Sequence, residues 1–156
     1  MVDNFPHLPD GKKTVLFVCT GNTCRSPMAE YCLKWLSRGE IPAVSAGLYA
    51  FDGEAMSENS LSALAGKGID GSSFRSRSVT FDLVDSAALI LTMTASHRAE
   101  LLIRFPEAAE KCHTLLEISG GGDVPDPFGR TPEVYRQTLE VICRNVEKWL
   151  ETFNNF

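Results

Sequence analysis

The residues most able to do chemistry in this chain lie close together near its start, in the stretch VLFVCTGNTCRSPMAE at residues 15–30. A cysteine is followed six positions later by an arginine, the C-x5-R spacing of Cys19 and Arg25. Gly21 and Asn22 tolerate positive φ angles, so the backbone N–H groups of a tight loop can converge on an anion. The guanidinium adds a fork that can hold two phosphate oxygens at once. The loop is therefore predicted to bind a phosphate group.

Cys19 is the candidate nucleophile of this loop. It begins the loop and is expected to point to its centre, where amide donors and a helix N-terminus should lower the pKa of its thiol. A thiolate beneath a bound phosphoryl group is placed for in-line attack on phosphorus. Ser26 can donate its hydroxyl to the sulfur. Besides Cys19 and Arg25, the loop residues expected to contact the substrate are Thr20, Gly21, Asn22, Thr23, Cys24 and Ser26.

The segments on either side of the loop read as a strand and a helix. TVLFVC is a continuous apolar run, typical of a strand buried on both faces. SPMAEYCLKWLSRG reads as a helix with Ser26 as N-cap, Pro27 at the first helical position and Gly39 just past the end. Further strands are expected at AVSAG, ALILTM and CHTLLEI, and further helices at SENSLSALAGKG, SHRAELLIRFP and from about Pro132 to Phe153.

The alternation of strands and helices predicts an α/β fold. We expect a three-layer domain with a four-stranded parallel sheet and helices on both faces. Ligands bind such sheets outside the carboxyl ends of the strands, where Cys19 stands. At 156 residues the chain fits one domain, predicted over residues 14–156 after a flexible polar arm at residues 1–13.

Composition narrows the setting and the partners. No apolar run could span a membrane and no signal-peptide core is present, so the cytoplasm is the expected location. A net charge of −5 argues against binding to nucleic acid. The three histidines match no metal-ligand spacing; we expect no metal and no cofactor, and a monomer. The five cysteines are expected to be reduced thiols. Three of these, on apolar faces, are interpreted as core residues: Cys32, Cys112 and Cys143.

The stretch at residues 15–30 closely resembles the signature of the low-molecular-weight protein tyrosine phosphatases. The resemblance covers almost the whole chain after the N-terminal arm, through SAG at residues 45–47, GID at 68–70 and DPF at 126–128. It implies a cysteine-dependent phosphatase that acts on a phosphorylated protein through a phosphocysteine intermediate and needs no metal.

A general acid and two aromatic walls follow from the motif and the resemblance. Asp126 lies between two prolines and matches the family's acid, which protonates the leaving group and then activates water. Asp123, beside a glycine run, is interpreted as a solvated turn residue. Phe128 and Phe51 resemble the aromatic walls that flank the family's substrate, although each could equally pack on the core.

The resemblance also assigns a role to the second cysteine of the loop. The family uses it to trap an oxidised nucleophile as a reversible disulfide, which implies a Cys19–Cys24 pair. One departure concerns Phe74, which stands where many relatives have a histidine. That histidine joins a hydrogen-bond network to Asn22 and Ser45; here those two residues can still bond each other, but the rest of the network is open.

Thr23 bears on the substrate class. Tyrosine-directed relatives usually have a bulky aliphatic residue at this position. A threonine here, like the phenylalanine at residue 128, resembles the pattern of the bacterial protein arginine phosphatases. A hydroxyl can accept a hydrogen bond from a guanidinium, and an aliphatic side chain cannot. Phosphoarginine is therefore the predicted substrate group, with phosphotyrosine as the alternative.

Two other classes are less consistent with the sequence. An arsenate reductase on this fold would need a mid-chain pair of redox cysteines, and the chain has none between Leu33 and Lys111. A phosphopeptide-binding domain without catalysis would have no use for the acid Asp126.

Overall fold

The computed structural model describes residues 14–153, so the predicted arm at residues 1–13 lies outside the described residues. The strands are β1 (Thr14–Cys19), β2 (Ala43–Gly47), β3 (Ala87–Thr92) and β4 (Cys112–Thr114). They form one sheet in the order β2-β1-β3-β4, and every neighbouring pair is parallel. The predicted four-stranded parallel sheet is confirmed.

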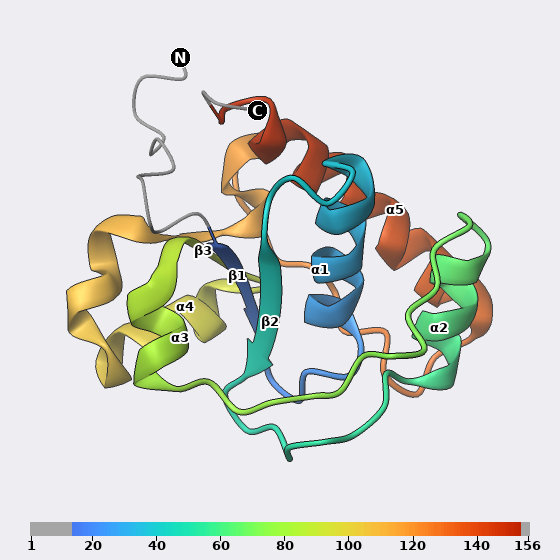
Figure 1. Ribbon diagram of the computed structural model, residues 1–156, viewed down its shortest axis with the longest axis horizontal. Coiled ribbons are helices and arrows are strands. Elements are labelled where there is room, and N and C mark those ends of the chain that lie inside the picture. The colour runs from blue at the N-terminus through green and yellow to red at the C-terminus, as the bar shows by residue number, and fades with distance from the viewer. Residues whose placement is uncertain (1–13, 154–156) are drawn as a thin grey trace.

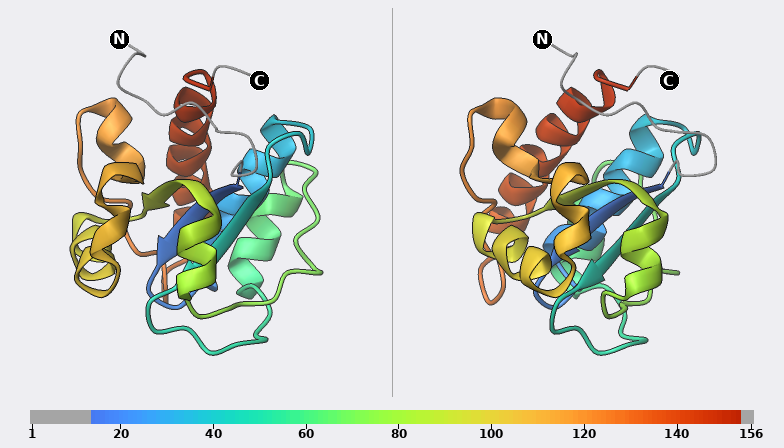
Figure 2. Two further views of the ribbon diagram at one scale, coloured as in Figure 1. Left: turned by 60° about the vertical axis from the view of Figure 1, so that its left-hand side comes forward. Right: turned by 90° about the vertical axis from the view of Figure 1, so that its left-hand side faces the viewer.

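Helices cover both faces of this sheet. They are α1 (Arg25–Leu36), α2 (Glu58–Ala65), α3 (Phe81–Ser86), α4 (Ala95–Arg104) and α5 (Pro132–Leu150), with short 3-10 segments η1 (Pro106–Lys111) and η2 (Leu115–Ser119). Figure 1 shows α1, α2 and α5 on one side of the strands and α3 and α4 on the other. In the right-hand view of Figure 2, α3 and α4 lie in front of the sheet and α5 lies behind it.

The side chains of β1 explain why both faces need cover. Val15 and Phe17 belong to one apolar core with Trp149 of α5, whereas Leu16 and Val18 belong to a second core with Leu101 of α4. All four strand residues are fully buried. Successive residues of a strand point to opposite faces, so a continuous apolar run requires a helical layer on each side.

Two local expectations are corrected by the structure, and one helix was not predicted. The predicted strand CHTLLEI ends at Thr114, because its partner β3 ends at Thr92 and leaves η2 without a neighbour to pair with. Helix α3 was not predicted; its six residues, capped by Thr80, are too few to show a helical period. Ser26 is not the N-cap of α1, which is Cys24; Ser26 lies inside the helix, with its hydroxyl engaged by Cys19.

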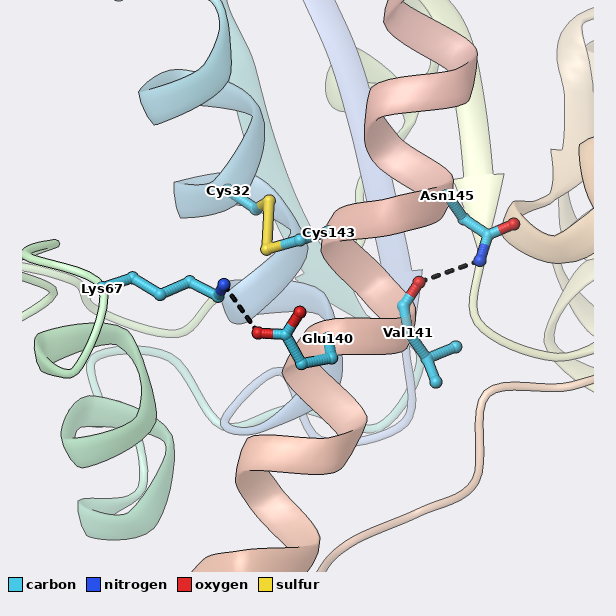
Figure 3. The surroundings of a disulfide bond; sticks show 6 residues. All are labelled: Cys32, Lys67, Glu140, Val141, Cys143 and Asn145. Atoms are coloured by element: carbon cyan, nitrogen blue, oxygen red, sulfur yellow. Dashed lines mark hydrogen bonds and ion pairs between the residues drawn. A yellow bond between two sulfur atoms is a disulfide. The ribbon is translucent and has the colours of Figure 1, made fainter.

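The expectation of five reduced cysteines is wrong for one pair. Cys32 of α1 and Cys143 of α5 form a disulfide, with their Cα atoms 5.9 Å apart (Figure 3). An ion pair of 2.7 Å between Lys67 and Glu140 lies nearby on the same side of α5. The bond joins residues 111 positions apart, so only the packing of α1 against α5 brings them together. The free cysteines, all buried, are Cys19, Cys24 and Cys112.

Candidate active site

The loop that joins β1 to α1 forms the wall of a pocket of about 210 Å³ at the carboxyl end of the sheet. Its lining residues are Cys19, Thr20, Gly21, Asn22, Thr23, Cys24, Arg25, Asp126 and Phe128. Ser26 does not line the pocket but bonds to Cys19 from within α1. Phe51 also lies outside the lining, on the surface with 76% of its area exposed, so its role as a wall stays a prediction.

The Cys19 sulfur is buried and held by a chain of hydrogen bonds. Its Sγ lies 2.8 Å from Ser26 Oγ, and Asn22 Nδ2 donates to that same oxygen at 2.9 Å. Because Asn22 supplies a hydrogen to Ser26 Oγ, the Ser26 hydroxyl hydrogen is available to the sulfur. This hydrogen bond, backbone donors and the charge of Arg25 favour the thiolate, but burial outweighs them and raises the pKa of Cys19. The expected lowering of this pKa is therefore wrong.

The side chain of Asn22 holds the loop in place through several hydrogen bonds. Its φ of 57° places it in the left-handed region, and its side chain fixes it there. Nδ2 donates to Ser45 Oγ at 2.9 Å, and Oδ1 accepts from the backbone N–H of Arg77 at 2.9 Å. Ser45 in turn donates to Glu30 Oε1 at 2.7 Å, and Glu30 Oε2 pairs with Lys34 at 2.6 Å. The Asn22–Ser45 bond that the sequence allowed is present.

Phe74 does not interrupt this network. Its side chain is buried in the core and meets the Tyr31 ring edge to face, with centroids 6.1 Å apart. The network continues instead to Glu30, a residue that the sequence analysis missed. No local signal indicated Glu30, because it is two residues from Met28 and from Cys32 and so lies on nearly the opposite side of the helix. Its burial follows from packing beside Ser45 of β2, which gives the carboxylate a partner.

Gly47 of the SAG motif lets the loop approach β2. A Cβ built at this position would lie 2.5 Å from the Thr20 carbonyl oxygen and 3.1 Å from Asn22 Cβ. Backbone bonds hold the same contact, because Leu48 N donates to the Cys19 carbonyl at 3.0 Å and Tyr49 N donates to that of Thr20 at 2.9 Å. Any side chain at residue 47 would therefore displace the loop.

Arg25 connects the loop to the segment that carries the predicted acid. Its Nη1 donates to the Val124 carbonyl at 3.1 Å, and its Nη2 lies 3.7 Å from Asp126 Oδ2. Val124 N donates to the Met93 carbonyl at 2.9 Å, just past β3. Asp126 also accepts from Phe128 N at 3.1 Å and keeps more than half of its side chain exposed. A carboxyl group thus stands at the rim, beside the guanidinium and open to solvent.

Asp123 has a more specific role than the solvated turn residue that we expected. Its Oδ1 accepts from Ala95 N at 2.8 Å, at the N-terminus of α4. It therefore ties the loop that carries Asp126 to that helix. Another residue of α4 without a sequence-based assignment, His97, lies 2.8 Å from the Thr20 hydroxyl through Nε2. No local pattern indicates this contact, because 77 positions separate the two residues.

Cys24 lies on the side of the loop that faces α5. Its Sγ is 3.6 Å from Tyr135 Oη and 3.4 Å from Ser57 Oγ. Burial and the contact with Cys24 raise the pKa of Tyr135 to about 12. Both Cys19 and Cys24 are free thiols, so the disulfide trap stays a prediction.

Residues 14–153 contain no group of three or more His, Cys, Asp or Glu side chains able to hold a metal ion. None of their helices is long and apolar enough to cross a membrane.

Residues 14–155 match the family model described as low molecular weight phosphotyrosine protein phosphatase. The chain belongs to this family. A protein-arginine-phosphatase from Geobacillus stearothermophilus is 39% identical over 143 residues, covering 88% of this chain and 96% of its own. A probable low molecular weight protein-tyrosine-phosphatase, EpsP, from Ralstonia nicotianae is 35% identical over 138 residues, covering 88% of this chain and 94% of its own.

Solved structures agree with the sequence comparison. The YwlE arginine phosphatase from Geobacillus stearothermophilus superimposes with a TM-score of 0.84 at 38% identity, covering 88% of this chain and 90% of that one. A low molecular weight protein tyrosine phosphatase from T. tengcongensis gives a TM-score of 0.85 at 40% identity, covering 88% and 97%. This family member is thus a phosphoprotein phosphatase of the tyrosine/arginine type, a hydrolase.

Proposed function

We propose that this protein removes phosphate from phosphoarginine side chains of proteins through a phosphocysteine intermediate. The observation that carries the proposal is the convergence of three groups on one pocket: the Cys19 sulfur at its floor, Arg25 in its wall and Asp126 at its rim. A nucleophile, an anion clamp and a proton donor are the parts that transfer of a phosphoryl group to sulfur requires.

In the first step the substrate phosphoryl group occupies the loop, with its oxygens on the backbone N–H groups and the Arg25 guanidinium. The bound phosphoryl dianion takes the proton of the Cys19 thiol, and the resulting thiolate attacks phosphorus; a sulfur–phosphorus bond forms and the phosphorus–nitrogen bond breaks. The electron pair of that bond stays on the arginine nitrogen, which takes a proton from the Asp126 carboxyl group. Ser26 stabilises the thiolate, because its hydroxyl hydrogen is available to the sulfur.

In the second step water hydrolyses the phosphocysteine. The Asp126 carboxylate accepts a proton from the water as its oxygen bonds to phosphorus. The sulfur–phosphorus bond then breaks and inorganic phosphate leaves. Its electron pair returns to Cys19, where the Ser26 hydroxyl again stabilises the negative charge.

Thr23 favours phosphoarginine as the substrate group. It is half-buried in the pocket wall, two residues before Arg25, where its side chain can meet the first atoms beyond phosphorus. Its hydroxyl can accept a hydrogen bond from a guanidinium N–H. Two curated relatives named protein-arginine-phosphatase, at 39% and 38% identity, support the same choice.

Phosphotyrosine is the second candidate, because the pocket rim also suits an aromatic substrate. Phe128 lines the pocket with 75% of its area exposed, and an exposed ring there can stack on a phenyl group. The tyrosine-phosphatase names of other relatives, such as EpsP, point the same way.

The experiment that separates the candidates compares kcat/KM on phosphoarginine and phosphotyrosine peptides for wild type, Thr23→Ile and Thr23→Ser. Isoleucine keeps the β-branch and removes the acceptor, so activity on phosphoarginine should fall by about 100-fold or more while activity on phosphotyrosine is kept. Serine is the matched control, because it keeps the hydroxyl and should retain the preference. A wild type that prefers phosphotyrosine, with neither rate changed by Thr23→Ile, would refute the phosphoarginine assignment.

A further inference from the structure

His97 is a buried polar side chain to which the proposed reaction assigns no step. It lies in the first turn of α4 with 8% of its area exposed, and its backbone N–H donates to the N-cap oxygen of Thr94 at 3.0 Å. Its Nε2 lies 2.8 Å from Thr20 Oγ1. The other ring nitrogen, Nδ1, is buried and has no hydrogen-bond partner. The ring therefore makes a single side-chain hydrogen bond, and that bond goes to the phosphate loop.

The charge state of the ring assigns the direction of this bond. Burial and the positive charge of Arg25 lower the pKa of His97 to about 4, against the opposing charges of Asp123, Asp126 and Glu100. The ring is thus neutral near pH 7 and carries one N–H. Placing that hydrogen on Nδ1 would bury a donor without a partner, so we assign it to Nε2, which donates to Thr20 Oγ1.

The same turn of α4 is bound to the loop that carries the acid. Asp123 accepts a hydrogen bond from the Ala95 N–H at 2.8 Å. Ala95 lies two residues before His97, and Asp123 lies three residues before Asp126. One end of α4 therefore holds two segments at once. Asp123 joins it to the acid-bearing loop, and His97 joins it to Thr20, the residue directly after the nucleophile.

We propose that His97 is a positioning residue that fixes the first residue of the phosphate loop relative to the acid-bearing loop through its bond to Thr20. The inference rests on the proposed function for its catalytic part. Thr20 is otherwise held at its carbonyl by Tyr49 N–H, so its side chain has one anchor among the described residues, and that anchor is His97. Without it, the N–H groups at the start of the loop converge less precisely on the phosphate.

Three substitutions of His97 separate positioning from simple packing. The terminal amide of glutamine reaches about as far as Nε2, whereas that of asparagine reaches only as far as Nδ1. We expect His97→Ala and His97→Asn to lower kcat/KM by about tenfold, the value of one hydrogen bond of ~1.4 kcal/mol. His97→Gln should recover most of this loss. Equal losses for glutamine and asparagine, with equal unfolding midpoints, would mean that the ring only fills space.

Binding of inorganic phosphate tests the inference without catalysis. We would measure it by calorimetry in Cys19→Ser, which keeps the loop and Arg25, and in Cys19→Ser combined with each His97 variant. The dissociation constant should rise severalfold with His97→Ala and recover with His97→Gln. An unchanged constant would overturn the proposal. If wild type hydrolyses no phosphopeptide although phosphate binding follows this pattern, the proposed function fails and the positioning role stands.

A double-mutant cycle with Thr20→Val supplies the decisive control. Valine keeps the shape of threonine and removes the oxygen that His97 contacts. If His97 acts through Thr20, the double variant should lose little more activity than Thr20→Val alone, so His97→Ala should cost almost nothing in that background. Additive losses would overturn the proposal. Should His97→Ala not fold, Thr20→Val and His97→Asn, whose losses should likewise not add, carry the same cycle.

Discussion

Reduction of the Cys32–Cys143 disulfide should lower the stability of the folded protein by several kcal/mol. The bond closes a loop of 111 residues, and in the chain-entropy relation such a closure stabilises the fold by about 4.8 kcal/mol at 25 °C. Measured stabilisation by disulfides is commonly about 2–4 kcal/mol, so we expect reduction to cost about that much free energy of unfolding. With a urea m-value of about 2 kcal/mol/M, the midpoint should fall by about 1–2 M.

The assay is urea unfolding of wild type, Cys143→Ala and Cys112→Ala, each with and without dithiothreitol. Reductant should lower the midpoint of wild type and leave that of Cys143→Ala unchanged. Cys112→Ala is the matched control, since it removes a buried, free sulfur from the core and keeps the disulfide. It should therefore respond to reductant as wild type does. The reasoning would be refuted if dithiothreitol left the unfolding midpoint of wild type unchanged, or if Cys32 and Cys143 could be alkylated in the unreduced protein.

Three further predictions concern the pocket. Asp126→Ala should slow a phosphopeptide by about 100-fold or more, and p-nitrophenyl phosphate much less, because nitrophenolate leaves with little protonation; equal losses would assign the acid to another group. Ser26→Ala removes a hydrogen bond that lowers the pKa of Cys19, so that pKa should rise further and inactivation by iodoacetamide at pH 7 should slow. If the pH profile of the inactivation rate does not move to higher pH, this prediction is wrong. Gly47→Ala places a Cβ 2.5 Å from a loop carbonyl oxygen, so it should weaken phosphate binding in calorimetry and lower the free energy of unfolding by about 1–3 kcal/mol. Unchanged phosphate binding would mean that the loop tolerates displacement.

The parts of the site that lie within one short segment could be predicted from the sequence. The spacing of Cys19 and Arg25, between an apolar run and a helix, indicates an anion-binding loop because strand, loop and helix are all local. The alternation of strands and helices likewise predicted the parallel sheet, and with it the position of Cys19 at a carboxyl end. Asp126 was reached in another way, through the Asp-Pro-aromatic motif of the family.

Contacts between distant segments were decided only by the tertiary structure. Periodicity reports which face of a helix is buried, but not which residue of another helix meets it. Cys32 and Cys143 were thus assigned to the core and not to each other, and nothing in the sequence joined His97 to Thr20. The raised pKa of Cys19 was likewise decided by the tertiary structure. The loop sequence indicates the donors that lower it, but the larger opposing effect is the depth of burial, which depends on how the whole domain packs around the sulfur.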